Sequence, residues 1–123
     1  MKPLIHFADP APEPVLDHPR PDRLVRGNPD RLTWDRYTSP DGLTSAGEWA
    51  CEPGAWRIAF ATGKEEFFHV LEGRLRIADA EGHAREYGPG DAGLIPAGFR
   101  GTFEVIEPVK KRYVIVERPT ENR

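Results

Sequence analysis

The sequence has 123 residues, of which 38% are hydrophobic and 30% are charged. This length suits one globular domain and is too short for two ordinary ones, and the composition excludes a disordered tail and a membrane span. A net charge of -3 gives no sign of a nucleic-acid or anionic-membrane partner. The single cysteine, Cys51, excludes an intrachain disulfide framework and a cysteine-rich zinc site. Because no apolar run near the start suits a signal peptide, we expect a cytosolic (cytoplasmic) protein.

The first 30 residues are rich in proline and lack the pattern of a domain. The stretch 9–22 cannot hold a helix, because each proline removes an N–H donor and restricts the residue before it. We therefore expect residues 1–30 to form an extended arm, with 4–7 as a candidate strand at a sheet edge. An arm on a small body often packs on a neighbouring subunit, so this arm and an outer sheet face predict a homodimer.

From residue 31 onward the pattern changes to short strands separated by turn signals. Apolar and polar side chains alternate clearly over 56–61 and 74–77, and no window has sustained helical spacing. Residues 31–123 are therefore predicted to form an all-β domain. This number of strands must close into a barrel or sandwich to hide the strand edges. The predicted strands are 33–37, 44–51, 55–61, 66–72, 74–79, 84–87, 91–95, 101–106 and 111–117.

Glycines, a proline and a glutamate recur at fixed spacings in two places. The first is Gly54-x5-Phe60-x-Thr62-x3-Glu66-x6-Gly73 and the second is Gly90-x5-Pro96-x-Gly98-x2-Gly101-x3-Val105. These resemble the two cupin motifs, G-x5-H-x-H-x3-4-E-x6-G and G-x5-P-x-G-x2-H-x3-N. The amino-acid sequence over 67–73, 96–105 and 107–113 is similar to that of the small single-domain cupins grouped with (S)-ureidoglycine aminohydrolase and the ethanolamine-utilisation cupin. The resemblance implies a jelly-roll barrel, the double-stranded β-helix of cupins.

The glycines and prolines between the predicted strands suit the turns of such a barrel. Gly73 lies between two predicted strands, where a hairpin needs a residue with positive φ. The stretch 88–91, Gly-Pro-Gly-Asp, predicts a tight turn, and 96–98, Pro-Ala-Gly, predicts another.

The resemblance also implies where a metal would lie. In metal-binding cupins, three histidines and the glutamate of the motifs converge in the barrel, a set that suits manganese, iron, nickel or zinc. The matching positions here are Phe60, Thr62, Glu66 and Gly101. Phenylalanine and glycine side chains cannot coordinate a metal, so we expect no conventional metal site and no cofactor. His69 follows Glu66 by three residues, and strand alternation without a bulge directs it to the opposite face.

Glu66 is the most informative residue, because the resemblance places it inside an aromatic-lined barrel. A carboxylate in apolar surroundings must find a cation or a donor, or bind a proton. It is a candidate general acid or base, with Tyr113 as a candidate catalytic partner, or an anchor for a ligand. The alternative is a structural carboxylate satisfied by a backbone N–H or by Tyr113, Arg57 or Thr62.

The predicted ligand pocket combines this acid with the aromatic side chains. At the former histidine positions Phe60 fills space whereas Gly101 opens it, so we expect a partly open pocket. Bulky side chains also serve simply to fill small barrels, so the pocket is weighed against a packed interior. The pocket residues are Trp56, Phe60, Thr62, Glu66, Phe68, Gly101, Phe103 and Tyr113.

The basic run 110–112, with Arg100 nearby, is either an anion site or a solvated strand edge, and the second use is the commoner. We expect a cupin that binds a small polar metabolite without a conventional metal site. One alternative is a metal-independent isomerase, epimerase or lyase that uses Glu66 as acid or base. The other is a structural cupin with a filled barrel and no ligand.

Overall fold

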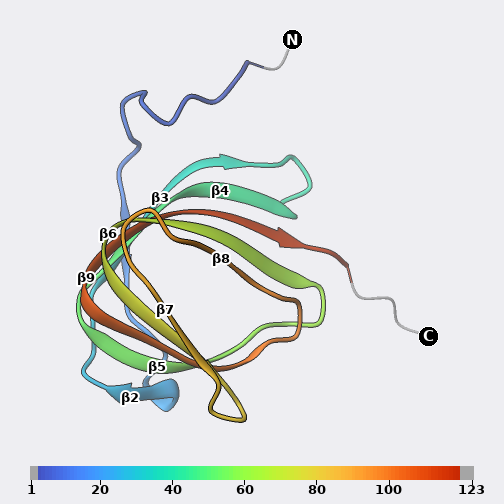
Figure 1. The fold of residues 1–123 in the computed structure, drawn as a ribbon. Helices are drawn as coiled ribbons and strands as arrows, with labels where there is room; N and C mark the ends of the chain where they lie inside the picture. The colour runs from blue at the N-terminus through green and yellow to red at the C-terminus, as the bar shows by residue number, and fades with distance from the viewer. Residues whose placement is uncertain (1–2, 120–123) are drawn as a thin grey trace.

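The computed structural model describes residues 3–119 of the protein. Within this range the chain forms a 9-stranded sheet that curls into a barrel, together with one short 3-10 helix (Figure 1). No helix in the described range is long and apolar enough to cross a membrane. The elements are β1 (Val15–Asp17), η1 (Pro21–Arg23), β2 (Leu24–Arg26), β3 (Arg31–Thr38), β4 (Thr44–Cys51), β5 (Gly54–Ala59), β6 (Lys64–Asp79), β7 (Ala84–Tyr87), β8 (Ala92–Ile95) and β9 (Arg100–Glu117).

Two long strands, β6 and β9, organise the barrel. Strand β9 pairs with β4, β5 and β6, and strand β6 also pairs with β7 and β8. Each long strand merges two predicted ones, so the predicted breaks at Gly73 and within β9 are wrong. Gly73 does have a positive φ of 82°, but it bends β6 instead of closing a hairpin. A Cβ atom there would lie 2.0 Å from the carbonyl oxygen of Pro108, so the two bent strands approach closely at this point.

The other two predicted turns are confirmed. The N–H of Asp91 donates to the carbonyl oxygen of Gly88 at 2.9 Å, and Gly90 between them has a φ of 91°. The N–H of Phe99 donates to the carbonyl oxygen of Pro96 at 3.1 Å. These turns lead the chain into β8 and from β8 into β9, which fixes the order of the barrel strands.

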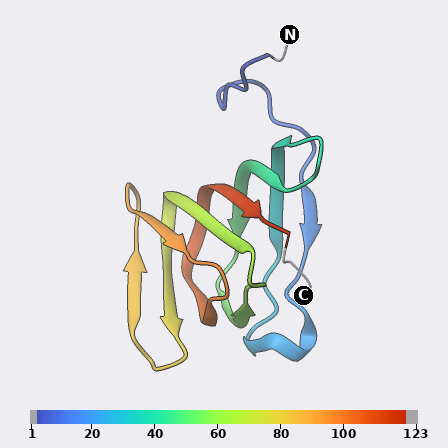
Figure 2. The ribbon, with the colours of Figure 1, turned by 90° about the vertical axis from the view of Figure 1, so that its right-hand side faces the viewer.

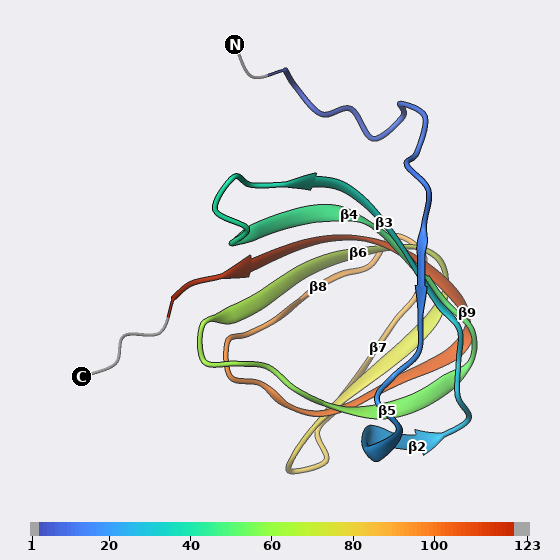
Figure 3. The same cartoon turned by 180° about the vertical axis from the view of Figure 1, so that it is seen from behind.

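The proline-rich segment adds two short strands to the edges of the same sheet. Strand β1 pairs with β3, and β2 pairs with β5, both antiparallel. The strand predicted over 4–7 is wrong, because the chain turns there through a hydrogen bond from the Asp9 N–H to the carbonyl oxygen of His6. Residues 3–14 run beyond one end of the barrel (Figures 2 and 3). The paired strands occupy stretches free of proline, where every residue keeps its N–H donor.

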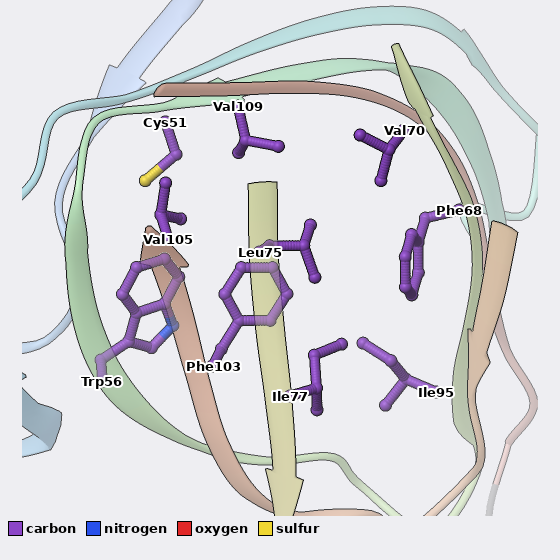
Figure 4. Packing of buried hydrophobic residues seen from close by; sticks show 10 residues of the cluster. All are labelled: Cys51, Trp56, Phe68, Val70, Leu75, Ile77, Ile95, Phe103, Val105 and Val109. Carbon is purple, nitrogen blue, oxygen red and sulfur yellow. The ribbon is translucent and has the colours of Figure 1, made fainter. Parts of the chain in front are cut away.

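The hydrophobic core fills part of the barrel interior (Figure 4). Side chains along β6 point alternately into the core and outward. Phe68 and Val70 are fully buried, whereas Phe67 is 47% exposed. The rings of Trp56 and Phe103 stack with centroids 5.1 Å apart. The cluster comprises Cys51, Trp56, Phe68, Val70, Leu75, Ile77, Ile95, Phe103, Val105 and Val109.

Candidate ligand-binding site

A cavity of about 580 Å³ lies beside the core, between the inner faces of β3, β4, β5, β6 and β9. Five residues of the predicted pocket line it: Trp56, Phe60, Glu66, Phe103 and Tyr113. Four of them lie on β5, β6 and β9, where every second side chain points inward, and Phe60 directly follows β5.

Three other predicted pocket residues lie elsewhere. Thr62 is exposed in the turn after β5, and Phe68 is fully buried in the core. Gly101 does not open the cavity, contrary to the expectation from the sequence. A Cβ atom at Gly101 would lie 1.9 Å from the backbone oxygen of Ala78, so the missing side chain allows β6 and β9 to pack closely.

The polar centre of the cavity is a buried ion pair. Lys111 donates a hydrogen bond of 2.7 Å from Nζ to Oε2 of Glu66, and the two residues are 4% and 8% exposed. The predicted solvated edge is therefore wrong for Lys111, although Arg112 is exposed. None of the donors proposed from the sequence bonds to Glu66. Its partner is Lys111, which strand alternation over 109–113 places on the inward face with Val109 and Tyr113.

Three aromatic rings surround the ammonium of Lys111. Its Nζ lies 4.6 Å from the ring centroid of Trp49, 5.0 Å from that of Phe68 and 4.9 Å from that of Phe103. The negative faces of aromatic rings attract a cation at such distances. Together with the carboxylate of Glu66, they offset part of the cost of removing the ammonium from water.

A second polar group in the cavity contains Tyr113 and Asp35. The hydroxyl of Tyr113 donates to Oδ1 of Asp35 at 3.3 Å, and Thr38 also donates to this carboxylate. Burial, followed by the negative charge of Asp35, raises the pKa of Tyr113 well above its usual range. Tyr113 is therefore a neutral donor bound to Asp35, which the sequence did not single out, and its hydroxyl is not bonded to Glu66.

A third pair lies where the N-terminal segment meets the barrel. Arg31 donates to both carboxylate oxygens of Asp17, at 2.9 Å and 2.7 Å, and its guanidinium lies 5.3 Å from the ring centroid of Trp56. Both charged residues line the cavity, so strand β1 contributes to its wall.

These residues do not fit the metal that the cupin resemblance implies. Only Glu66 of the four ligand positions offers a suitable donor there, and the ammonium of Lys111 already bonds to it. A metal ion beside Glu66 would therefore meet a positive charge instead of imidazole nitrogens. His69 pairs in the ladder with exposed Arg112, while Glu66 faces the cavity. Elsewhere in the described range, Asp79, Glu81 and His83 have possible metal-ligand atoms close to one another. Asp79 Oδ1 already accepts hydrogen bonds from the backbone N–H groups of Glu81 and His83 in this turn.

The curled antiparallel sheet, its two long strands and its internal cavity have the architecture of a small β-barrel, as cupins do. The family model for the EutQ-like cupin domain matches residues 38–113, more than half of the chain, and the protein belongs to this family. The chain thus keeps the motif glycines of cupins while lacking their histidines. No curated protein matches the sequence.

Solved structures show the same fold at low sequence identity. A DUF861-family protein of unknown function from Pseudomonas syringae pv. tomato has a TM-score of 0.76 and 17% identity, over 91% of this chain and 46% of that one. The EutQ protein of Clostridium difficile has a TM-score of 0.62 and 22% identity, over 72% of this chain and 64% of that one. A putative ethanolamine utilization protein Q from Salmonella typhimurium has a TM-score of 0.64 and 20% identity, over 87% and 98%. The chain thus spans about half of the first protein and just under two thirds of the second.

Proposed function

We propose that the protein binds a small polar metabolite in the barrel cavity without a conventional metal site. The observation that carries this proposal is the buried Lys111–Glu66 pair on the wall of a cavity of about 580 Å³. This volume lies within the range of small-molecule sites, which combine apolar walls with a few placed polar groups. Trp49, Trp56 and Phe60 supply such walls.

The charges of the cavity indicate the kind of ligand. Its basic residues are Arg31, Lys64 and Lys111, and its acidic residues are Asp17, Asp35 and Glu66. Because the two sets balance, the cavity favours a ligand with both donors and acceptors over one with several charges of the same sign.

Metal-independent isomerase, epimerase or lyase chemistry is the second candidate function. It is supported by the position of Glu66, whose carboxylate can accept a proton from a ligand while Lys111 can donate one. Tyr113 has a smaller part in this alternative, since its hydroxyl bonds to Asp35. A fully packed barrel has less support, because a cavity of ligand size remains beside the core. The cytoplasmic location and the homodimer stay predictions.

Titration calorimetry with a panel of hydroxy acids, amino acids and sugars tests the binding proposal. Thr33 lines the cavity, whereas Leu32 beside it in β3 lies on the opposite face. Thr33→Trp should abolish binding of any ligand that the panel identifies, and the matched control Leu32→Trp should retain it. Equal binding by both folded variants, or no binding across the panel, would contradict the proposal.

A further inference from the structure

We propose that Lys111 captures carbonyl compounds covalently, by forming an imine with a small aldehyde or α-oxo acid in the cavity. This inference rests on the proposed function and adds the chemical class of the ligand. A lysine amine is a nucleophile toward carbonyl carbon once a neighbouring group has removed its proton. Lys111 lines the cavity, and Oε2 of Glu66 lies 2.7 Å from its Nζ in position to accept that proton.

Two other lysines show what distinguishes Lys111. Lys64 also lines the cavity, but its Nζ lies over the ring of Phe60 and has no carboxylate at ion-pair distance in the described part of the chain. Lys110 is next to Lys111 in β9, and its Nζ lies over Trp34 outside this cavity. Only at Lys111, within residues 3–119, do a lysine amine, a cavity and a bonded carboxylate coincide.

The reaction balances without any further reagent. Glu66 accepts a proton from the ammonium, and the free amine attacks the carbonyl carbon to form an N–C bond. One proton moves from this nitrogen to the former carbonyl oxygen, which gives a carbinolamine. Glu66 then protonates the hydroxyl, the C–O bond breaks, and water leaves. The products are a protonated imine, water and the Glu66 carboxylate, with no change in net charge and no oxidation or reduction.

The surroundings of Lys111 suit the product as well as the free side chain. A protonated imine carries its positive charge on the same nitrogen, so Glu66 and the rings of Trp49, Phe68 and Phe103 can stabilise it as they do the ammonium. Burial at 4% exposure also limits the water that would hydrolyse the imine. The three rings and the carboxylate therefore form a cage for a cationic adduct.

Borohydride trapping tests this proposal directly. The folded protein is incubated with pyruvate, reduced with sodium borohydride, and analysed by intact mass and peptide mapping. We expect one carboxyethyl group at Lys111, added on the order of tenfold faster than at Lys110 or Lys64. Lys111→Arg keeps the positive charge and should lose the modification, Lys110→Arg should keep it, and Glu66→Gln should slow it about tenfold or more.

Modification that is equally fast at Lys110 and Lys64, or absent from Lys111 in the folded protein, would overturn the imine proposal. Such a result leaves the proposed function intact, because the calorimetry with Thr33→Trp and Leu32→Trp measures binding without any covalent step. In unfolded protein the preference for Lys111 over Lys110 and Lys64 should disappear, since the proposal requires the assembled cavity.

Discussion

Lys111 and Glu66 stand 45 residues apart in the chain, yet they meet at 2.7 Å inside the barrel on the neighbouring strands β9 and β6. Both are almost completely buried, so neither charge has much water around it. The pair therefore links the side chains of the two longest strands, and it forms the polar centre of the cavity.

Removing one partner of this pair should strongly destabilise the fold. Lys111→Met leaves the carboxylate of Glu66 buried without its cation, at an expected cost of about 3–5 kcal/mol in the free energy of unfolding. The double variant Lys111→Met with Glu66→Leu should be more stable than Lys111→Met alone, because it leaves no unpaired charge. Urea denaturation compares the wild type, Lys111→Met and the double variant, and Lys110→Met serves as the control on the other face. A double variant less stable than Lys111→Met would contradict this interpretation.

Much of the fold follows from local patterns in the sequence. The alternation over 56–61 and the turn signals at 88–91 and 96–98 indicated an all-β barrel or sandwich, and the cupin spacing of glycines implied the jelly-roll barrel. The strand break at Gly73 was wrong because a glycine with positive φ suits a hairpin and a bend within a strand equally well. The break predicted between 106 and 111 was wrong because β9 continues through Pro108. At Gly73 the choice depends on the approach of Pro108, a tertiary contact with no local signal.

The cavity was harder to predict than the fold. The inward position of Glu66 followed from family register, but its partner lay in a basic run whose composition suggests a solvated edge. The alternation Val109, Lys111, Tyr113 was a usable signal, since a valine and a tyrosine of the same parity indicate that the lysine also faces inward, and the structure buries all three. Asp35 gave no comparable signal, because its contact with Tyr113 joins strands 78 residues apart.

Tyr113 should make the protein sensitive to alkaline pH. Its pKa is raised in the folded state by burial and by Asp35, so the folded protein keeps a proton that the unfolded chain loses above about pH 10. The resulting stability is present below pH 10 and is lost progressively as the pH rises toward the folded pKa. In urea denaturation, the wild-type free energy of unfolding should fall more steeply above about pH 10 than that of Tyr113→Phe.

The slope with pH is the useful measurement here, because losing the hydrogen bond to Asp35 lowers the stability of Tyr113→Phe by a similar amount at every lower pH. Tyr37→Phe, at an exposed tyrosine, should keep the wild-type slope. Parallel curves for wild type and Tyr113→Phe would show that Tyr113 ionises as readily in the folded protein as in the unfolded chain.

Cys51 should react slowly despite being a free thiol. Burial raises its pKa to about 12, against the opposing positive charges of Arg31 and Lys111. Because the thiolate is the reactive form, its fraction near pH 8 should be about 10³-fold below that of an ordinary cysteine. Reaction with Ellman's reagent should accordingly be slower by a similar factor in the folded protein and reach the ordinary rate in concentrated urea. Fast reaction in the folded state would contradict the burial of this thiol.

Gly101 should resist even the smallest substitution. A Cβ atom at this position would lie 1.9 Å from the backbone oxygen of Ala78, so Gly101→Ala must push β6 and β9 apart. We expect a loss of about 1–3 kcal/mol in the free energy of unfolding, measured by urea denaturation. Gly88→Ala is the matched control, because its Cβ would meet only the flexible end of Arg74 at 3.1 Å, and its cost should be smaller. The same contact means that restoring the cupin histidine with Gly101→His should impair folding before any metal can bind. Equal stability of Gly101→Ala and wild type would show that the strands have room for the histidine that this chain lacks.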